Sequence, residues 1–455
     1  MDNLFLQGPF APQRNEGRGE ATVIEGQIPA DLNGTLYRAG ASPYFDPLFP
    51  ELHHWFDGDG YITALTLSEG QATVRSSYVA TAGLQAEKAA GKALYGSFMN
   101  GGVAPIMDGS RPPFKNPANT NVVRHDGELL VFCEADVPHR LDPDTLETRG
   151  MYDFGGIQGP VTAHFKIDPA SGEWLFFGSM GKAVQFYRAD RSGQVIARHP
   201  FQLDAPCFLH DFAVSENYAI FFATPALSDF NFVLQGKPAS VWDPEVQTRI
   251  GLMERSTGEL RWYPVDQAFA TTHFLNAFEQ DGKVIVDVNC APDFGARANE
   301  RVPFSVAKPW RWTIDPATGK VSGTQMADFN SEFPRINDLW TGRQHRYGYY
   351  AGTDTDTFCK DCLFDKLVKH DTVTGNHLYQ SVSPELNSPG EPVFVPREGA
   401  TAEDDGYVLS IWWDAARDAS ELVILDAQDF AGKPLARVRL GTRVPMGFHG
   451  NWAAH

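Results

Sequence analysis

The chain has 455 residues, 42% of them hydrophobic and 12% aromatic, which is enough apolar material for a large core and excludes global disorder. A formal net charge of −19 would repel the phosphates of nucleic acids, so nucleic-acid binding is excluded as a function class. Five cysteines, an odd number in a long chain, fit a reducing cytoplasm. The one CxxC, Cys359 to Cys362, is interpreted as loop thiols, with a redox role as the alternative, since a structural zinc site would need a second pair.

The N-terminus, MDNLFLQGPFAPQRNEG, shows no export signal. Its apolar run is too short for the core of a signal peptide, and it lacks a basic start. No later stretch approaches the roughly 18 apolar residues of a spanning helix. We therefore expect a cytoplasmic protein without a transmembrane segment.

Turn-rich strand pairs recur along the chain. Each is a polar or Gly-containing turn followed by a β-rich run, and each is preceded by another extended segment, which is typical of a hairpin. In chain order the seven units begin at Asp57, His125, Ala170, Ser215, Gln280, His345 and Asp404. Seven sheet units at this spacing predict an all-β fold, a seven-bladed β-propeller. A pair of β-sandwiches would explain the strands but not their even spacing.

Helical patterning is scarce and is best in AEKAAGKALYGSF, residues 86–98. We expect residues 1–455 to form one propeller domain, with dome elements near 86–112 and 223–250 on one face. Within the second element, ATPALSDFNFVLQGKP (223–238) is a candidate for peripheral contact with a membrane surface. A buried segment between strands explains the same residues equally well.

Histidines occupy equivalent positions in three consecutive units. His164, His210 and His273 each stand just before a hairpin turn, and His449 closes the chain about three units later. The first strand of each propeller blade lines the central channel, so the four imidazoles should converge on the axis. Without a partner their ring nitrogens would be unsatisfied in an apolar setting, and a metal removes this difficulty. Imidazole ligands suit zinc, copper, iron or nickel.

Three glutamates stand in apolar or Pro-rich runs where a surface Glu would be unusual: Glu134, Glu332 and Glu391. Histidines that bind a metal usually give their second N–H to a carboxylate or a carbonyl, which fixes the ring. We predict this role for the three glutamates. Three unrelated, exposed glutamates are the alternative.

Motifs along nearly the whole chain point to one family. They include GQIPADLNGTLYRAGASP (26–43), HHWFDGDG (53–60), KNPANTNV (115–122), TAHFKIDPASGEWLFFG (162–178), LHDFAVSENYAIF (209–221), EFPRIN (332–337), EPVFVPR (391–397) and GFHGNW (447–452). In these motifs the chain resembles the carotenoid cleavage oxygenases, which include bacterial apocarotenoid oxygenases and lignostilbene dioxygenases. The resemblance implies a seven-bladed propeller with a helical dome over an axial metal.

The resemblance also implies an activity. The family splits a C=C bond of a conjugated, lipophilic substrate with O2, giving two carbonyl products without an organic cosubstrate. Thr120 matches the family's threonine near the open coordination site, and the three glutamates match those that hold its ligands. The residues that match its Fe(II) ligands are His164, His210, His273 and His449. Trp55, Phe56 and Phe274 are candidates for lining the substrate tunnel, although each would serve equally well in a core.

The sequence departs from one branch of the family. Members that cleave stilbenes and phenylpropenoids carry a Lys just before the first of these glutamates and a Tyr after the cap helix, and this pair polarises the para-hydroxyl of the substrate. This chain has Cys133 and Phe98 at those positions. Phe98 has no hydroxyl and a thiol is a weak donor. We therefore expect an apocarotenoid-like substrate, with aryl alkenes as the alternative.

Two other classes remain to be weighed. A propeller that binds ligands but has lost catalysis is disfavoured because all four histidines are retained. A zinc hydrolase is disfavoured because catalytic zinc usually keeps three protein ligands and an open position.

Overall fold

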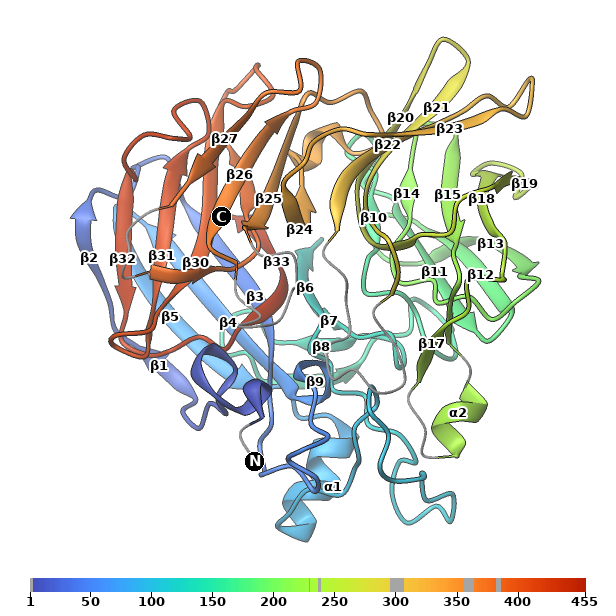
Figure 1. The fold of residues 1–455 in the computed structure, drawn as a ribbon. Helices are drawn as coiled ribbons and strands as arrows, with labels where there is room; N and C mark the ends of the chain where they lie inside the picture. Colours follow the sequence, from blue (N-terminus) through green and yellow to red (C-terminus); the bar gives the residue numbers. More distant parts are fainter. Residues whose placement is uncertain (1–2, 229, 236–238, 295–306, 355–363, 382–385) are drawn as a thin grey trace.

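The computed structural model describes residues 3–228, 230–235, 239–294, 307–354, 364–381 and 386–455. Over these residues seven antiparallel sheets of four to six strands are arranged around a common centre (Figure 1). The predicted all-β, seven-bladed propeller is confirmed. Cys359 and Cys362 lie outside the described residues.

Five sheets are built from strands that follow one another along the chain. In the fourth sheet a short insertion separates the second strand from the third. The second sheet contains β6 (Asn121–His125), β7 (Glu128–Phe132), β8 (His139–Leu141) and β9 (Thr148–Met151). The third contains β10 (Lys166–Ile167), β11 (Trp174–Met180), β12 (Ala183–Ala189) and β13 (Val195–Gln202). The fourth contains β14 (Ala213–Val214), β15 (Tyr218–Ala223), β18 (Thr248–Glu254) and β19 (Leu260–Val265). The fifth contains β20 (Ala270–Gln280), β21 (Lys283–Ala291), β22 (Lys308–Ile314) and β23 (Val321–Gln325). The sixth contains β24 (Asn330–Arg335), β25 (Tyr347–Thr353), β26 (Lys366–Asp371) and β27 (His377–Gln380).

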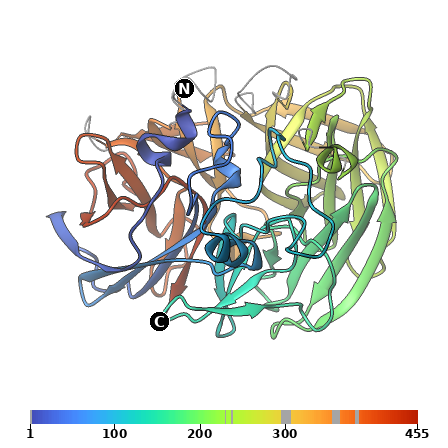
Figure 2. The same cartoon turned by 90° about the horizontal axis from the view of Figure 1, so that it is seen from below.

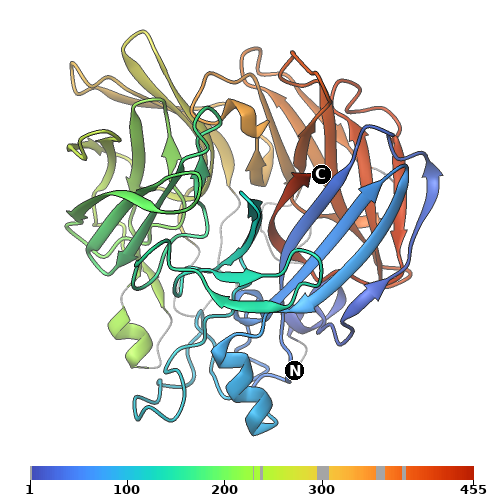
Figure 3. The same ribbon diagram turned by 180° about the vertical axis from the view of Figure 1, so that it is seen from behind.

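The first and seventh sheets combine strands from both ends of the chain. The first contains β1 (Gly17–Gly19), β5 (Gln71–Tyr78), β4 (Asp59–Ser68), β3 (Gly34–Ser42) and β33 (Gly447–Ala454). The seventh contains β2 (Ala21–Gly26), β32 (Ala436–Leu440), β31 (Ala419–Asp426), β30 (Gly406–Asp414), β28 (Leu386–Pro389) and β29 (Val393–Pro396). In Figure 1 the blue β2 lies beside the red β32, and Figure 3 shows β33 beside β3. Because β33 carries His449, closing the ring also brings this histidine to the centre.

The core lies between neighbouring sheets. One apolar cluster joins Ile220 and Phe222 of β15 to Val284 and Val286 of β21, and every residue of β3 is buried. Strands that are packed on both faces consist of nearly continuous apolar residues. These apolar runs between polar turns made the hairpins recognisable in the sequence.

The first helix differs from the sequence prediction in both bounds. The prediction covered residues 86–98, whereas α1 spans Ala82–Ala90. The hydroxyl of Thr81 caps its first turn, and Gly91 adopts the left-handed conformation with φ of +69°, which ends the helix. The apolar spacing beyond Gly91 therefore belongs to a loop. Lys115 ties the helix to the propeller, since its Nζ lies 2.7 Å from carboxylate oxygens of both Glu87 and Asp59.

The remaining helical and paired elements are short. A two-stranded sheet contains β16 (Ala226–Ser228) and β17 (Ser240–Trp242), and α2 spans Phe230–Leu234. Four 3-10 helices span Leu4–Leu6, Gly8–Phe10, Trp55–Asp57 and Asp338–Trp340. Both α-helices lie below the sheets in Figure 1 and in front of them in Figure 2, so they share one face.

The helices α1 and α2 overlap the segments predicted as a dome, but the dome and the single-domain assignment of 1–455 both stay predictions. Residues 229 and 236–238 of the candidate membrane segment lie outside the described part of the chain, and its contact with a membrane also stays a prediction. Where the structure describes the chain, no helix is long and apolar enough to cross a membrane.

Buried neutral histidines make the fold sensitive to acid. Burial lowers the pKa of His370 to about 4, and burial together with His53 lowers that of His54 to about 3. Because the unfolded side chains titrate near 6.5, the unfolded state binds more protons below that pH. The free energy of unfolding should therefore fall as the pH drops from 6.5 towards 4. Denaturant titrations of metal-free protein at pH 7.5 and 5 measure this loss, and His370→Phe should reduce it. A variant with the same pH dependence as the parent would contradict this account.

Candidate metal centre

Four histidines meet where the inner strands of the propeller converge. His164 lies two residues before β10 and His210 three residues before β14, while His273 lies within β20 and His449 within β33. Nε2 of His210 lies 3.0 Å from Nε2 of His164 and 3.3 Å from Nε2 of His273. The ring centre of His449 lies 4.5 Å from that of His164 and 4.8 Å from that of His273. The structure thus brings together all four histidines singled out in the sequence.

Three of the four imidazoles contact a carboxylate through the other ring nitrogen, Nδ1. The distances are 2.7 Å for His210 and Glu134, 2.6 Å for His273 and Glu332, and 2.8 Å for His449 and Glu391. His164 has no such carboxylate contact among the residues described. The three glutamates that the sequence singled out therefore all lie against the histidine cluster.

The arrangement of ring nitrogens fits a bound cation. Where Nδ1 carries the proton that a glutamate accepts, Nε2 of the same neutral ring presents a lone pair. In that neutral tautomer His210 and His273 would direct two lone pairs at each other across 3.3 Å, and two lone pairs repel. A metal ion between the rings converts this repulsion into ligation, and imidazole donors suit iron, zinc, copper or nickel.

Burial and neighbouring charges set the protonation of these rings. Burial and the surrounding imidazoles lower the pKa of His164 well below its usual value. Burial also outweighs Glu391 and lowers the pKa of His449 to about 4. Both rings are neutral at pH 7, as metal ligation requires. For His210, burial would lower the pKa, but the carboxylates of Glu134, Asp211 and Glu332 together outweigh it and raise the pKa.

The three carboxylates differ in how their charge is compensated. Glu391 contacts the guanidinium groups of Arg38 at 3.1 Å and Arg335 at 3.2 Å, and it accepts the Gly450 N–H at 2.8 Å. Burial alone would raise the pKa of Glu391, but Arg335, His449 and Arg38 outweigh it and lower the pKa to about 2.

The other two carboxylates have no arginine partner in the described part of the chain. Glu332 accepts hydrogen bonds from the Thr272 hydroxyl and the Phe333 N–H. These contacts and His273 outweigh burial and lower the pKa of Glu332. Glu134 is more accessible, with 28% of its side chain exposed. The histidine cluster is therefore charge-compensated beside His449 and more open beside His210.

Strand irregularities aim these side chains at the centre. β20 shifts register on both sides of the residue that follows His273, and β24 shifts between Glu332 and Arg335. The inner strand of the seventh sheet is divided into β28 and β29, and Glu391 lies in the gap between them. Bulges re-aim side chains at the cost of ladder pairing, and they are frequent next to active sites.

Two of the other candidate residues lie beside the cluster. The carbonyl of Thr120 accepts the His449 N–H at 3.0 Å, so the backbone of Thr120 lies directly beside β33 at this histidine. Cys133 lies against Thr120, and burial together with Glu134 raises the pKa of its thiol to about 11. Cys133 is therefore a neutral thiol at pH 7.

The aromatic candidates occupy three different environments. Trp55 is buried, stacks on Phe448 with 4.4 Å between ring centres, and donates its indole N–H to the Met446 carbonyl. Phe98 is 52% exposed in the loop after α1. Phe274 is buried among the apolar side chains between the fourth and fifth sheets. The burial of Phe274 against Phe222 fits the core alternative, and its role in lining a substrate tunnel stays a prediction.

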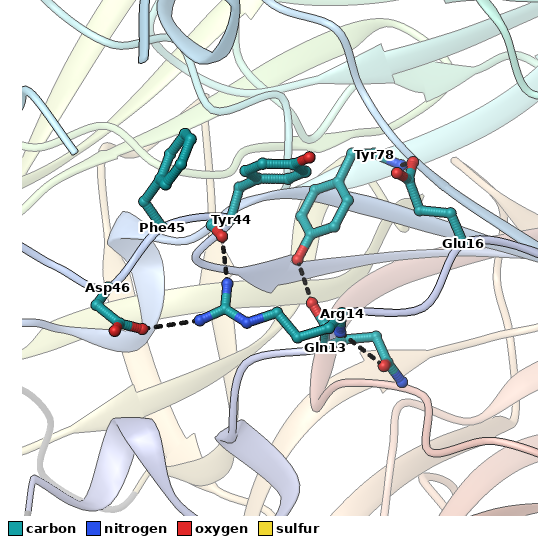
Figure 4. Close-up of a pocket in the computed structure, with 7 residues that line it drawn as sticks. All are labelled: Gln13, Arg14, Glu16, Tyr44, Phe45, Asp46 and Tyr78. Atoms are coloured by element: carbon teal, nitrogen blue, oxygen red, sulfur yellow. Dashed lines mark hydrogen bonds and ion pairs between the residues drawn. The ribbon is translucent and has the colours of Figure 1, made fainter. Parts of the chain in front are cut away.

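A separate pocket of about 310 Å³ lies between the N-terminal segment and the start of the β3–β4 connection (Figure 4). Its polar groups already bond one another: Tyr78 donates its hydroxyl to the Gln13 carbonyl, and Arg14 contacts Asp46 at 2.8 Å. None of the four histidines lines it. These contacts anchor the N-terminal segment, and the pocket is distinct from the histidine cluster.

Comparison with known proteins identifies the family of this propeller. The family model described as "RPE65: Retinal pigment epithelial membrane protein" matches residues 10–454, and the chain belongs to this family. The resemblance to carotenoid cleavage oxygenases found in the sequence is thereby confirmed.

Relatives of two kinds are similar to the chain over most of its length. Apocarotenoid-15,15'-oxygenase of Synechocystis is 35% identical, covering 94% of this chain and 92% of the relative. Isoeugenol monooxygenase of Pseudomonas putida is 32% identical, covering 98% and 97%. Among solved structures, lignostilbene dioxygenase of Pseudomonas brassicacearum has a TM-score of 0.92 at 30% identity, covering 100% of this chain and 99% of the other. Cobalt-substituted apocarotenoid oxygenase of Synechocystis has a TM-score of 0.87 at 33% identity, covering 98% and 97%.

Proposed function

We propose that the chain is a non-heme Fe(II) dioxygenase that cleaves a C=C bond of an apocarotenoid-like substrate with O2 and releases two carbonyl products. The observation that carries the proposal is the convergence of four imidazoles, in which Nε2 of His210 lies 3.0 Å from that of His164 and 3.3 Å from that of His273. The names of the relatives, which are oxygenases and dioxygenases, support the reaction class.

In this proposal the four histidines hold the metal, and Glu134, Glu332 and Glu391 fix the orientation of three rings through Nδ1. Fe(II), ligated by neutral imidazoles that leave its charge intact, would supply the O2 chemistry. Thr120, beside His449, would limit access to the remaining coordination positions. The protein itself would hold the alkene close to the metal in a site that excludes water.

The residues at the two positions where the phenol-cleaving relatives carry Lys and Tyr favour a polyene over a phenol. Cys133 is a neutral thiol whose pKa burial and Glu134 raise to about 11, and Phe98 has no hydroxyl. Neither side chain can polarise a para-hydroxyl group, whereas an apolar polyene needs no such contact.

Cleavage of an aryl alkene is the second candidate. It is favoured by the TM-score of 0.92 against a lignostilbene dioxygenase and by the 32% identity to an isoeugenol monooxygenase. A third outcome, a propeller that binds such compounds without turning them over, would show neither bound iron nor products.

Product analysis distinguishes these candidates. Protein loaded with Fe(II) would be offered apocarotenals and 4-hydroxystilbenes in detergent, with and without air. Oxygen-dependent polyene aldehydes are the expected result. Aromatic aldehydes alone would contradict the substrate assignment while leaving the metal site intact.

Restoring the phenol-binding pair should broaden the substrate range. We expect the double variant Cys133→Lys, Phe98→Tyr to gain about tenfold in kcat/KM on 4-hydroxystilbenes, because one charge-assisted hydrogen bond contributes roughly 1.5–3 kcal/mol. Phe98→Tyr alone is the control, since it adds a hydroxyl at an exposed position without the ammonium group. A folded, iron-loaded double variant without any gain would show that other residues exclude aryl alkenes.

A further inference from the structure

Asp211 links three neighbouring segments that carry histidines of the cluster. Its side chain is buried, with 2% exposed. Its Oδ1 accepts a hydrogen bond from Lys166 Nζ at 2.7 Å and one from the Phe212 N–H at 2.7 Å. Its Oδ2 accepts the Phe274 N–H at 2.8 Å.

Each partner stands close to a histidine in the chain. Lys166 comes two residues after His164, Asp211 itself follows His210, and Phe274 follows His273. One carboxylate therefore connects the third, fourth and fifth sheets at the height of the cluster. The three histidines that it links are the same ones whose ligand atoms all lie within 4.8 Å of one another.

The sheets themselves leave the position of these histidines weakly determined. His164 and His210 lie before their strands begin, outside the ladders of β10 and β14. His273 lies in a stretch of β20 where the register with β21 is interrupted. A ladder that is absent or interrupted cannot fix a side chain, so another contact has to do so.

We propose that Asp211 is a positioning residue, which sets the spacing of His164, His210 and His273 and so the affinity and geometry of the metal site. The inference rests on the proposed function, because it requires that these histidines hold a metal. Asp211 differs from the three glutamates in that it contacts no imidazole. It holds the backbone beside two of the rings and a side chain beside the third.

The carboxylate is suited to this role because it can only accept hydrogen bonds. All of its partners are donors, and Lys166 compensates its charge within the same contact. An amide at this position would turn an N–H group towards one of these donors. Asp211→Asn therefore removes at least one link while keeping the size of the side chain.

The test uses Co(II) as the probe, because its visible spectrum reports coordination geometry without catalysis. Asp211→Asn should bind Co(II) 10 to 100-fold more weakly than the parent, roughly the effect of losing a group that orients metal ligands, and its visible bands should shift. Asp287→Asn is the matched control: Asp287 is also a buried aspartate bonded to a cation, Arg311, but it contacts none of the four histidines. It should lower thermal stability and leave affinity and spectrum unchanged.

The outcomes separate the inference from the function on which it rests. If the parent protein binds no Co(II), the proposed metal site fails. If the parent binds Co(II) and Asp211→Asn matches it in affinity and spectrum, the positioning role is overturned. If Asp211→Asn does not fold, Lys166→Met serves as the second variant, and a shifted spectrum is expected. A folded Lys166→Met with the parent's spectrum would then assign Asp211 to the fold alone and overturn the proposal.

Discussion

Replacing His210 with Ala should abolish iron binding and turnover while leaving the propeller folded. His210 is the central member of the cluster, since its Nε2 lies 3.0 Å from that of His164 and 3.3 Å from that of His273. Its loss removes one ligand and separates the remaining rings. We expect bound iron to fall at least ~100-fold, beyond the 10 to 100-fold typical for residues that only orient a ligand. Iron content, turnover and circular dichroism of the purified protein measure the three quantities.

A surface histidine supplies the control for this result. His377 is exposed in β27, the outer strand of the sixth sheet, and His377→Ala should keep the iron and activity of the parent. A His210→Ala protein with full iron and full turnover would show that the four histidines do not form the metal site.

Replacing Glu391 with Gln should cost far more stability than the same change at Glu134. Glu391 is completely buried and compensates both Arg38 and Arg335, so the amide leaves the buried Arg38 guanidinium without this counter-charge and leaves Arg335 with Asp338 alone. Breaking a buried ion pair from one side costs about 3–5 kcal/mol in free energy of unfolding. Glu134 is partly exposed and contacts His210, so Glu134→Gln should cost about 1 kcal/mol or less. It should nevertheless weaken metal binding about 10 to 100-fold.

Denaturant titration of the two metal-free variants measures this difference. The sign of the pH dependence follows from the pKa of Glu391, which lies near 2 in the fold against 4.5 in the free side chain. The contribution of Glu391 to stability is therefore fully present above pH 4.5 and lost as the pH falls towards 2. Equal losses of stability in the two variants at pH 7 would contradict the role assigned to the arginines.

Repetition made the fold and the convergence of the histidines predictable from the sequence. The turns recur in each sheet, and three histidines stand at equivalent places in consecutive units, so the blade count and the convergence on the axis could both be inferred. The helix bounds could not. Apolar residues continue past Gly91, and only the left-handed backbone at that glycine shows where α1 ends.

The buried cations around the site were missed for a physical reason. Arg38 stands in the apolar run of β3, and Arg335 lies in EFPRIN, but a local sequence window does not show that both reach Glu391 from distant strands. A weaker signal was present in the prolines that follow Phe333 and Glu391. Proline inside a strand is confined to edges and bulges, and both prolines mark the irregularities that aim the glutamates inward.

The most direct test of the account is the stoichiometry of O2 consumption. Metal-free protein would be titrated with Fe(II) under anaerobic conditions, and O2 uptake and aldehyde formation would then be recorded together on an apocarotenal. The account predicts turnover in proportion to bound iron, saturating at one iron per chain, with one O2 consumed for each alkene cleaved. Turnover that is independent of bound iron, or cleavage without O2 uptake, would contradict it.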